Sequence, residues 1–149
     1  GSVLHVPFLW KDLPDFRTPC EQTIEALRFV RDAEKAGEKA FFHCTVGEDR
    51  TGYLAAMHGL IFEGADPREA FDLDMCERGY ASGNPQKPGF VIGELDEHVT
   101  PLYRAMAYLV AEGLLTAELD PSVCATEPEV PESFLPERLS CGVSTTLVP

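Results

Sequence analysis

Residues 40–62, AFFHCTVGEDRTGYLAAMHGLIF, join a short apolar run to an apolar helix through a polar loop that carries Cys44 and Arg50. The apolar run is too short for a helix and is typical of a buried strand, whereas residues 51–62 are apolar nearly all round, as in a central helix. A strand, a loop and a helix in this order gather the loop's N–H groups and the helix N-terminus around one point. The stretch therefore predicts an α/β fold with an anion site in the loop.

The sequence on either side continues this alternation. Residues 3–6 (VLHV) are expected to form a second short strand. Helices are expected over residues 18–36, 66–79 and 101–113, the first two from the capping signatures Thr18-Pro19 and Asp66-Pro67. Strands separated by helices pair in parallel, so we expect a central, mainly parallel sheet flanked by helices, with the loop at the carboxyl end of a strand.

The length and composition are typical of one globular domain. The chain has 149 residues, of which we expect 1–120 to form the domain and the proline- and acid-rich residues 121–149 an extended tail. With 12 Lys and Arg against 25 Asp and Glu, the net charge of −13 opposes binding to nucleic acid or anionic lipid. No run approaches the roughly 20 apolar residues of a membrane span, so a soluble protein is expected, either cytoplasmic or periplasmic/secreted. The sequence leaves the oligomeric state open.

The five cysteines do not form a metal-binding pattern. No Cys-x-x-Cys pair occurs and the His43-Cys44 doublet has no second copy, so no structural metal and no cofactor is expected. Cys20 and Cys76 fall within expected helices, where a buried thiol is the ordinary role. Cys124 and Cys141 lie in the tail, and whether they form a disulfide is left open.

The residue types in the loop suit phosphate chemistry. A helix N-terminus and a nearby cation lower the pKa of a thiol, so Cys44 is expected to be a nucleophilic thiolate. The fork of the Arg50 guanidinium matches two phosphoryl oxygens, and Gly47 lets the backbone approach the anion. The Thr51 hydroxyl is expected to contact the sulfur, and His43 to orient the loop. The remaining phosphate-binding backbone is expected from Thr45, Val46, Glu48 and Asp49.

His43-Cys44, five residues and Arg50-Thr51 resemble the signature of the cysteine-dependent protein tyrosine and dual-specificity phosphatases. The string HCTVGEDRTG is also similar to bacterial tyrosine phosphatases with Asp before the arginine, and the likeness extends over about residues 3–79. The resemblance implies metal-independent hydrolysis of a phosphomonoester through a cysteinyl-phosphate intermediate. The expected partner is a phosphorylated protein or a small phosphomonoester, with phosphotyrosine as the first candidate.

The resemblance also implies an aspartic acid that protonates the leaving oxygen. Asp15 is preferred because Pro14 to Pro19 resembles the family's acid loop, with Trp10 as an aromatic that could pack that loop. Asp12 is the second candidate. Asp49 is a third, because related lipid phosphatases carry Asp at that place in the loop.

Two departures from the family pattern limit the likeness. The acid loop begins after about ten residues, so either an N-terminal part is missing or the sheet is small. Glu48 stands where the similar bacterial enzymes usually carry Lys, which disfavours highly charged substrates. An inositol-phosphate or phosphoinositide phosphatase, which would need distant cations such as Arg68, Arg78 or Lys87, is the alternative enzyme. The same loop would also fit an inactive phosphate-binding module and, more weakly, a sulfurtransferase.

Overall fold

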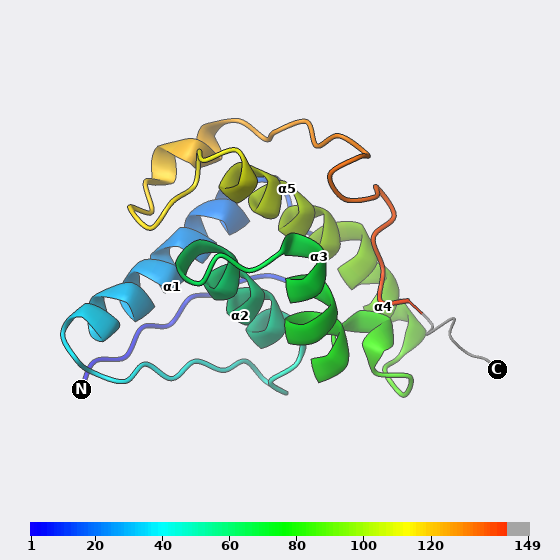
Figure 1. Cartoon of the computed structure of the whole chain (residues 1–149). Helices are drawn as coiled ribbons and strands as arrows, with labels where there is room; N and C mark the ends of the chain where they lie inside the picture. Colours follow the sequence, from blue (N-terminus) through cyan, green and yellow to red (C-terminus); the bar gives the residue numbers. More distant parts are fainter. Residues whose placement is uncertain (143–149) are drawn as a thin grey trace.

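The structure is a computed structural model that describes residues 1–142 as a group of helices (Figure 1). The helical segments are α1 (Arg17–Lys35), α2 (Asp49–Phe62), α3 (Pro67–Ala70), η1 (Phe71–Met75), η2 (Cys76–Arg78), η3 (Ala81–Gly83), α4 (Gly89–Glu94), η4 (Leu95–Val99), α5 (Thr100–Ala111) and η5 (Pro121–Ala125). The segments α3, η1 and η2 follow one another directly, and so do α4, η4 and α5. All the helices predicted from the sequence are present, with bounds that differ by one to three residues at most ends.

The N-terminus of α1 is capped differently from the prediction. Thr18 is not the capping residue; instead its backbone N–H donates to Asp15 Oδ1 at 2.9 Å. At α3 the predicted cap is confirmed, because Asp66 Oδ2 accepts from the Glu69 N–H at 3.0 Å. In both cases a carboxylate satisfies a helix N–H that has no partner within the helix.

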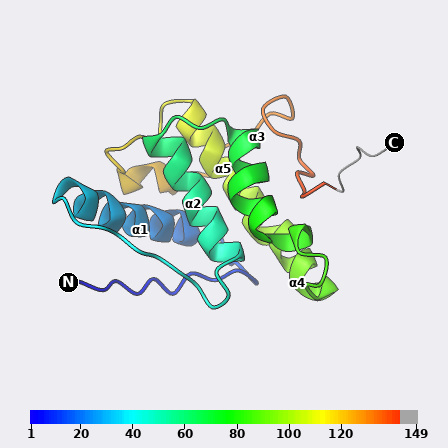
Figure 2. The same cartoon turned by 60° about the horizontal axis from the view of Figure 1, so that its bottom comes forward.

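The predicted central parallel sheet is wrong, because residues 1–142 contain no strand. Residues 3–6 and 40–44 run as extended chain along the same side of α1, as Figures 1 and 2 show. No backbone hydrogen bond within the described chain joins them. A cavity of about 640 Å³ is lined by residues of both segments.

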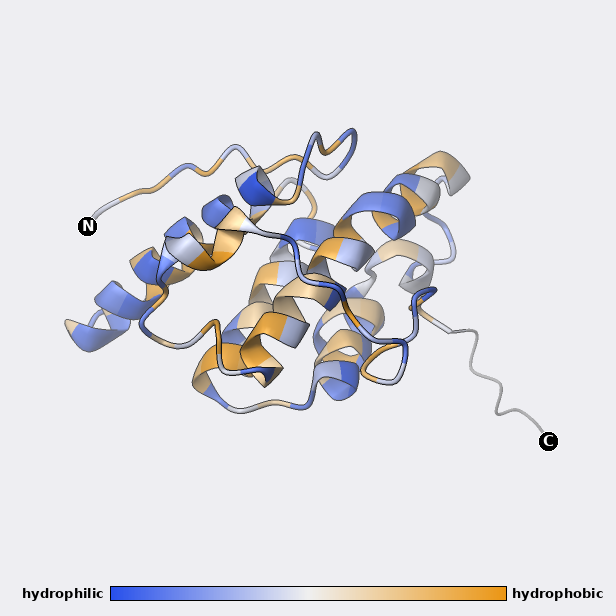
Figure 3. Ribbon diagram, turned by 90° about the horizontal axis from the view of Figure 1, so that it is seen from above, coloured by the Kyte–Doolittle hydropathy of each residue, from blue (hydrophilic) through white to orange (hydrophobic). Residues whose placement is uncertain are grey.

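Helices rather than strands fill the core. α2 lies at the centre and packs against η1 and α5. Tyr53, Phe71 and Tyr103 meet there, with the Phe71 and Tyr103 rings 5.6 Å apart and the Tyr53 ring edge-on to Tyr103. Figure 3 shows apolar ribbon concentrated inside the helix group and polar residues along the outer side of α1. Position 53 lies one turn into α2, so the packing of α2 fixes the helix end that adjoins the Cys44 loop.

Two disulfides fasten the C-terminal segment to the helices. Cys20 of α1 pairs with Cys124, and Cys76 pairs with Cys141. A Cys124–Cys141 bridge, which the sequence left open, is therefore not formed, and the expectation of buried thiols in the helices is wrong because both of those cysteines are bridged. The segment also contributes to the core through Leu135 and Leu139. Residues 143–149 of the predicted tail lie outside the described part of the chain.

Within residues 1–142, no helix combines the length and the apolar character that crossing a bilayer would need.

Candidate active site

The loop that joins residue 44 to α2 curls around the sulfur of Cys44. Gly47 has φ +74°, a backbone conformation that L side chains rarely adopt, and this turns the chain back toward the start of α2. The backbone N–H groups of Val46, Gly47 and Thr51 are directed to the sulfur. The loop thus gathers backbone N–H groups around the sulfur, as an anion site would require, although its preceding segment is not a strand.

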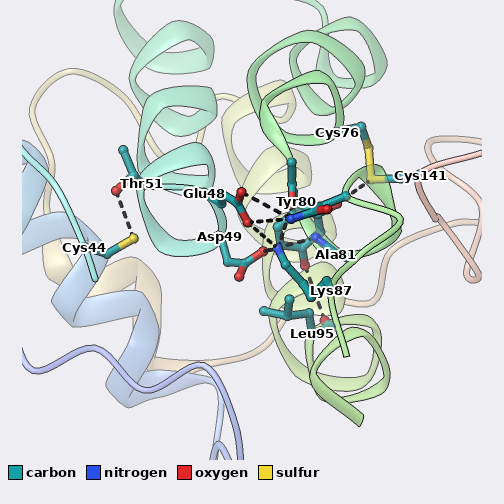
Figure 4. Close-up of polar contacts among 12 residues, drawn as sticks. Cys44, Glu48, Asp49, Thr51, Cys76, Tyr80, Ala81, Lys87, Leu95 and Cys141 are labelled. Atoms are coloured by element: carbon teal, nitrogen blue, oxygen red, sulfur yellow. Dashed lines mark hydrogen bonds and ion pairs between the residues drawn. A yellow bond between two sulfur atoms is a disulfide. The ribbon is translucent and has the colours of Figure 1, made fainter. Parts of the chain in front are cut away.

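Cys44 is the one free cysteine of the five and is only partly exposed. Burial raises the pKa of its thiol, but hydrogen bonds from the Thr51 hydroxyl and from the N–H groups of Thr51, Gly47 and Val46 lower it. The net pKa is below the ordinary value for a thiol. The Thr51 Oγ1 donates to Sγ at 3.1 Å (Figure 4). These contacts favour the thiolate, which is the nucleophilic form of cysteine.

Arg50 is the second residue of α2, at the end of the Cys44 loop. Its Nη2 donates to Thr45 Oγ1 at 3.1 Å, and its Nη1 lies 3.5 Å from the carbonyl oxygen of Phe8. Both cavities that adjoin Cys44 are lined by Arg50 and Thr45 as well. A phosphoryl group bound at Cys44 would therefore share these cavities with the Arg50 guanidinium.

His43 precedes the nucleophile and is exposed. Its Nδ1 is within hydrogen-bonding distance, 3.3 Å, of the Cys44 carbonyl oxygen, and its ring lies against Phe41 with centroids 5.7 Å apart. This contact is with the loop backbone, and the orienting role expected for His43 stays a prediction.

Two cavities meet at the nucleophile. The first, which we call the apolar cavity, is the one of about 640 Å³ between the extended segments, with Phe8, Phe42 and Tyr53 in its walls. The second, the polar cavity, has a volume of about 520 Å³. Its lining includes Trp10, Asn84, Gln86 and Lys87 in addition to the Cys44 loop. A substrate can thus approach Cys44 through either cavity, and the second one differs from the first by the charged side chains Glu48, Asp49 and Lys87 in its lining.

Glu48 and Asp49 are turned away from the sulfur toward residues 79–87 (Figure 4). Lys87 Nζ lies 3.0 Å from Glu48 Oε1 and 2.6 Å from Asp49 Oδ1. Asp49 Oδ1 also accepts from the Ala81 N–H at 3.1 Å. The two acidic side chains of the loop therefore contact Lys87 and Ala81, which lie outside the loop.

The sequence did not predict that Lys87 contacts the Cys44 loop, and indicated it only as one of several distant cations, without a partner. The available signal was the acidic pair Glu48-Asp49 inside an anion-binding loop, because such a pair requires a cation nearby. The pair alone does not indicate which basic residue supplies it.

The candidate acids do not contact the nucleophile in this structure. Asp15 is exposed, and its carboxylate accepts from the backbone N–H and, at 3.4 Å, the hydroxyl of Thr18. Asp12 is exposed as well and has φ +53°. Neither lines a cavity that contains Cys44, although Trp10 of the same segment does. Asp49 lines the polar cavity with its Oδ1 held by Lys87.

No group of three or more His, Cys, Asp or Glu side chains among the described residues is arranged to hold a metal ion.

Comparison with known proteins gives a match to a family model over part of the chain. Residues 9–67 match the model of the tyrosine phosphatase family, which confirms the resemblance for that part of the chain. The matched range contains the Cys44 loop and both exposed acid candidates, Asp12 and Asp15, but ends before Lys87. No curated protein and no solved structure gives a significant match to the chain.

Proposed function

We propose, from the family match of residues 9–67 and the contacts around Cys44, that this protein hydrolyses phosphomonoesters through a cysteinyl-phosphate intermediate. The family match supports a phosphatase function in general. The observation that supports the mechanism is the sulfur of Cys44, which faces three backbone N–H groups and the Thr51 hydroxyl, with Arg50 in the lining of the same cavities. A thiolate in this setting can attack phosphorus while the surrounding donors bind the phosphoryl oxygens.

The proposed reaction has two steps. In the first, Cys44 Sγ forms a bond to phosphorus as the ester P–O bond breaks, and an aspartic acid gives its proton to the leaving oxygen. In the second, water attacks the phosphorus, the S–P bond breaks, and the same carboxylate takes a proton from the water. Thr51 Oγ1, which donates to Sγ, stabilises the thiolate that departs. Asp15 is the proposed acid, with Asp12 as its competitor.

The nucleophile is tested by Cys44→Ser with p-nitrophenyl phosphate as substrate. Turnover should fall by at least about 100-fold, because a serine hydroxyl is far harder to ionise than this thiol near neutral pH. Orthovanadate should inhibit the parent competitively, and EDTA should leave its rate unchanged. A variant that keeps activity within about tenfold of the parent would exclude a cysteinyl-phosphate, since loss of the nucleophile should cost far more. Activity lost in EDTA and restored by added metal would indicate a metallophosphatase instead.

Phosphotyrosine is the substrate class that the charges around the site favour. Apart from the Cys44 thiolate, the charged side chains that line the polar cavity are Glu48, Asp49, Arg50 and Lys87, whose formal charges cancel. Lys87 contacts both carboxylates and is not a free cation. An inositol polyphosphate needs several free cations, whereas phosphotyrosine needs one phosphate site and an apolar wall for its ring, such as the apolar cavity provides.

The substrate proposal is tested by comparing kcat/KM for phosphotyrosine peptides and for inositol polyphosphates under the same conditions. We expect the phosphotyrosine peptides to be preferred by at least about tenfold, which corresponds to roughly 1.4 kcal/mol in transition-state binding. A kcat/KM for inositol polyphosphates that equals or exceeds the value for phosphotyrosine peptides would overturn the proposed substrate class. It would leave the cysteinyl-phosphate mechanism standing, because that mechanism rests on the Cys44→Ser result.

A further inference from the structure

Lys87 is the most completely surrounded basic side chain near the candidate site. Only 6% of its side chain is exposed, and its Nζ contacts three acceptors. These are Glu48 Oε1 at 3.0 Å, Asp49 Oδ1 at 2.6 Å and the Gly79 carbonyl oxygen at 2.6 Å. An ammonium group has three protons to donate, so each acceptor can take one.

The segment that carries Lys87 is shaped around the Cys44 loop. Gly79 has φ +98°, and a Cβ at that position would lie 3.0 Å from the carboxylate of Glu48. Ala81 has φ +46° and donates its backbone N–H to Asp49 Oδ1. Asn84 Nδ2 lies 3.4 Å from both carboxylate oxygens of Glu48. Both acidic side chains of the loop therefore make their polar contacts with residues 79–87.

This segment is in turn fixed to the helices. Tyr80 is buried, and its hydroxyl lies 2.7 Å from Thr100 Oγ1 and 3.3 Å from the Leu95 carbonyl oxygen. The Ser82 hydroxyl donates to the Cys141 carbonyl oxygen at 3.0 Å, next to the Cys76–Cys141 disulfide drawn in Figure 4. Lys87 thus connects the Cys44 loop to a segment with little freedom to move.

The charge of the site requires this connection. Without Lys87, the two carboxylates of Glu48 and Asp49 would stand beside the Cys44 thiolate with Arg50 as the loop's only basic side chain. The Glu48 and Asp49 side chains are 28% and 15% exposed, so water would screen them incompletely. An incoming phosphate dianion would be repelled.

We infer that Lys87 is a positioning residue of the phosphate site: it turns Glu48 and Asp49 out of the anion cradle and neutralises them, so that the loop can bind a phosphate dianion. The inference rests on the proposed function for the identity of the anion. It assigns Lys87 no contact with the substrate, and its effect on binding passes through the two acidic side chains.

The experiment compares Lys87→Met, which has a side chain of similar length without charge, with the matched control Lys35→Met on the exposed end of α1. The first readout is steady-state hydrolysis of p-nitrophenyl phosphate. Lys87→Met should raise KM about tenfold with a smaller change in kcat, because the variant no longer neutralises Glu48 and Asp49 and this weakens binding of the substrate anion. Lys35→Met should match the parent.

The second readout does not depend on turnover. Because Cys44 is the one free cysteine, iodoacetamide without reductant reports on it alone. Inorganic phosphate should slow this alkylation in the parent and in Lys35→Met, and should protect Lys87→Met about tenfold less at the same concentration. Circular dichroism checks that each variant is folded.

A compensating variant separates a charge effect from lost packing. In Lys87→Met combined with Glu48→Gln and Asp49→Asn, no charge is left unpaired, so both KM and phosphate protection should return toward the parent values. If the triple variant is as defective as Lys87→Met, or if Lys87→Met behaves as the parent in both readouts, the inference is overturned.

The proposed function can fail separately. A parent without turnover whose Cys44 is still protected by phosphate, with the protection lost in Lys87→Met, would support the Lys87 inference and reject the enzyme. A parent with turnover and a Lys87→Met variant that matches it in both readouts would support the enzyme and reject the Lys87 inference. If the parent shows no turnover and phosphate does not protect its Cys44, the loop is not a phosphate site and both fail.

Discussion

At the scale of single residues, Asp15 has a structural task that any catalytic role must accommodate. Its carboxylate accepts from the N–H and hydroxyl of Thr18 at the start of α1, on an exposed surface. Asp15 lines neither cavity at Cys44, whereas Trp10 lines the polar cavity. For Asp15 to protonate a leaving group, residues 10–16 would have to close over that cavity and give up the Thr18 contacts.

Asp15→Asn isolates the chemistry from the capping, because Asn caps a helix about as well as Asp but cannot donate an acid proton. We expect kcat to fall by the roughly 10²- to 10⁴-fold typical of a lost general acid on phosphotyrosine peptides, and by less on p-nitrophenyl phosphate, whose leaving group needs little protonation. The matched variant Asp12→Asn should be mild. Both variants should keep the unfolding temperature of the parent, because the contact at the start of α1 is retained. If Asp12→Asn lowers kcat more than Asp15→Asn does, the acid is Asp12.

The sequence indicated those site residues whose geometry is local. Gly47 and Thr51 lie within seven positions of Cys44, so the turn and the start of α2 determine where they lie. Lys87 contacts Asp49 across 38 positions, and only the packing of residues 79–87 brings it there. Nothing in the spacing of charges along the chain specifies such a contact, which explains why the residue was missed.

At the scale of elements, the sequence predicted the helices correctly and the sheet wrongly. The apolar face of α1 and the Asp66 cap of α3 are properties of neighbouring residues, so the sequence contains them directly. A sheet is a property of segments far apart, and a two-stranded one is marginal by itself. The segments 3–6 and 40–44 have strand-like composition, yet within residues 1–142 neither has a pairing partner.

The helix formed by α4 and η4 shows the opposite error. Gly89 and Gly93 in its first turns weaken the helical pattern, so the sequence suggested no element at residues 89–99. Leu95 and Val99 nevertheless lie fully buried in the core. Tertiary contacts outweigh a poor intrinsic propensity at this position.

At the scale of the whole molecule, the two disulfides determine how the ends of the chain are held. Cys20–Cys124 ties α1 to η5 over a separation of 104 residues, and Cys76–Cys141 ties the start of η2 to the last described residues over 65. Closing loops of this length limits the unfolded chain strongly, with about 4 to 5 kcal/mol expected in the chain-entropy model for a loop near 100 residues. The two disulfides therefore cross-link the segment after α5 to the helices at two points.

The bridges also interlace, since Cys76 lies inside the interval that Cys20 and Cys124 close and Cys141 lies outside it. Any single backbone cut between residues 20 and 141 therefore leaves two pieces joined through sulfur. Phe41, whose exposed fraction is 87%, is a ready site for a chymotrypsin-like protease. After one cleavage there and alkylation of Cys44, the nicked protein should migrate as a single species in denaturing electrophoresis and separate into two bands only with reductant. A Cys124–Cys141 bridge would release both fragments without reductant, so one gel distinguishes the two covalent topologies.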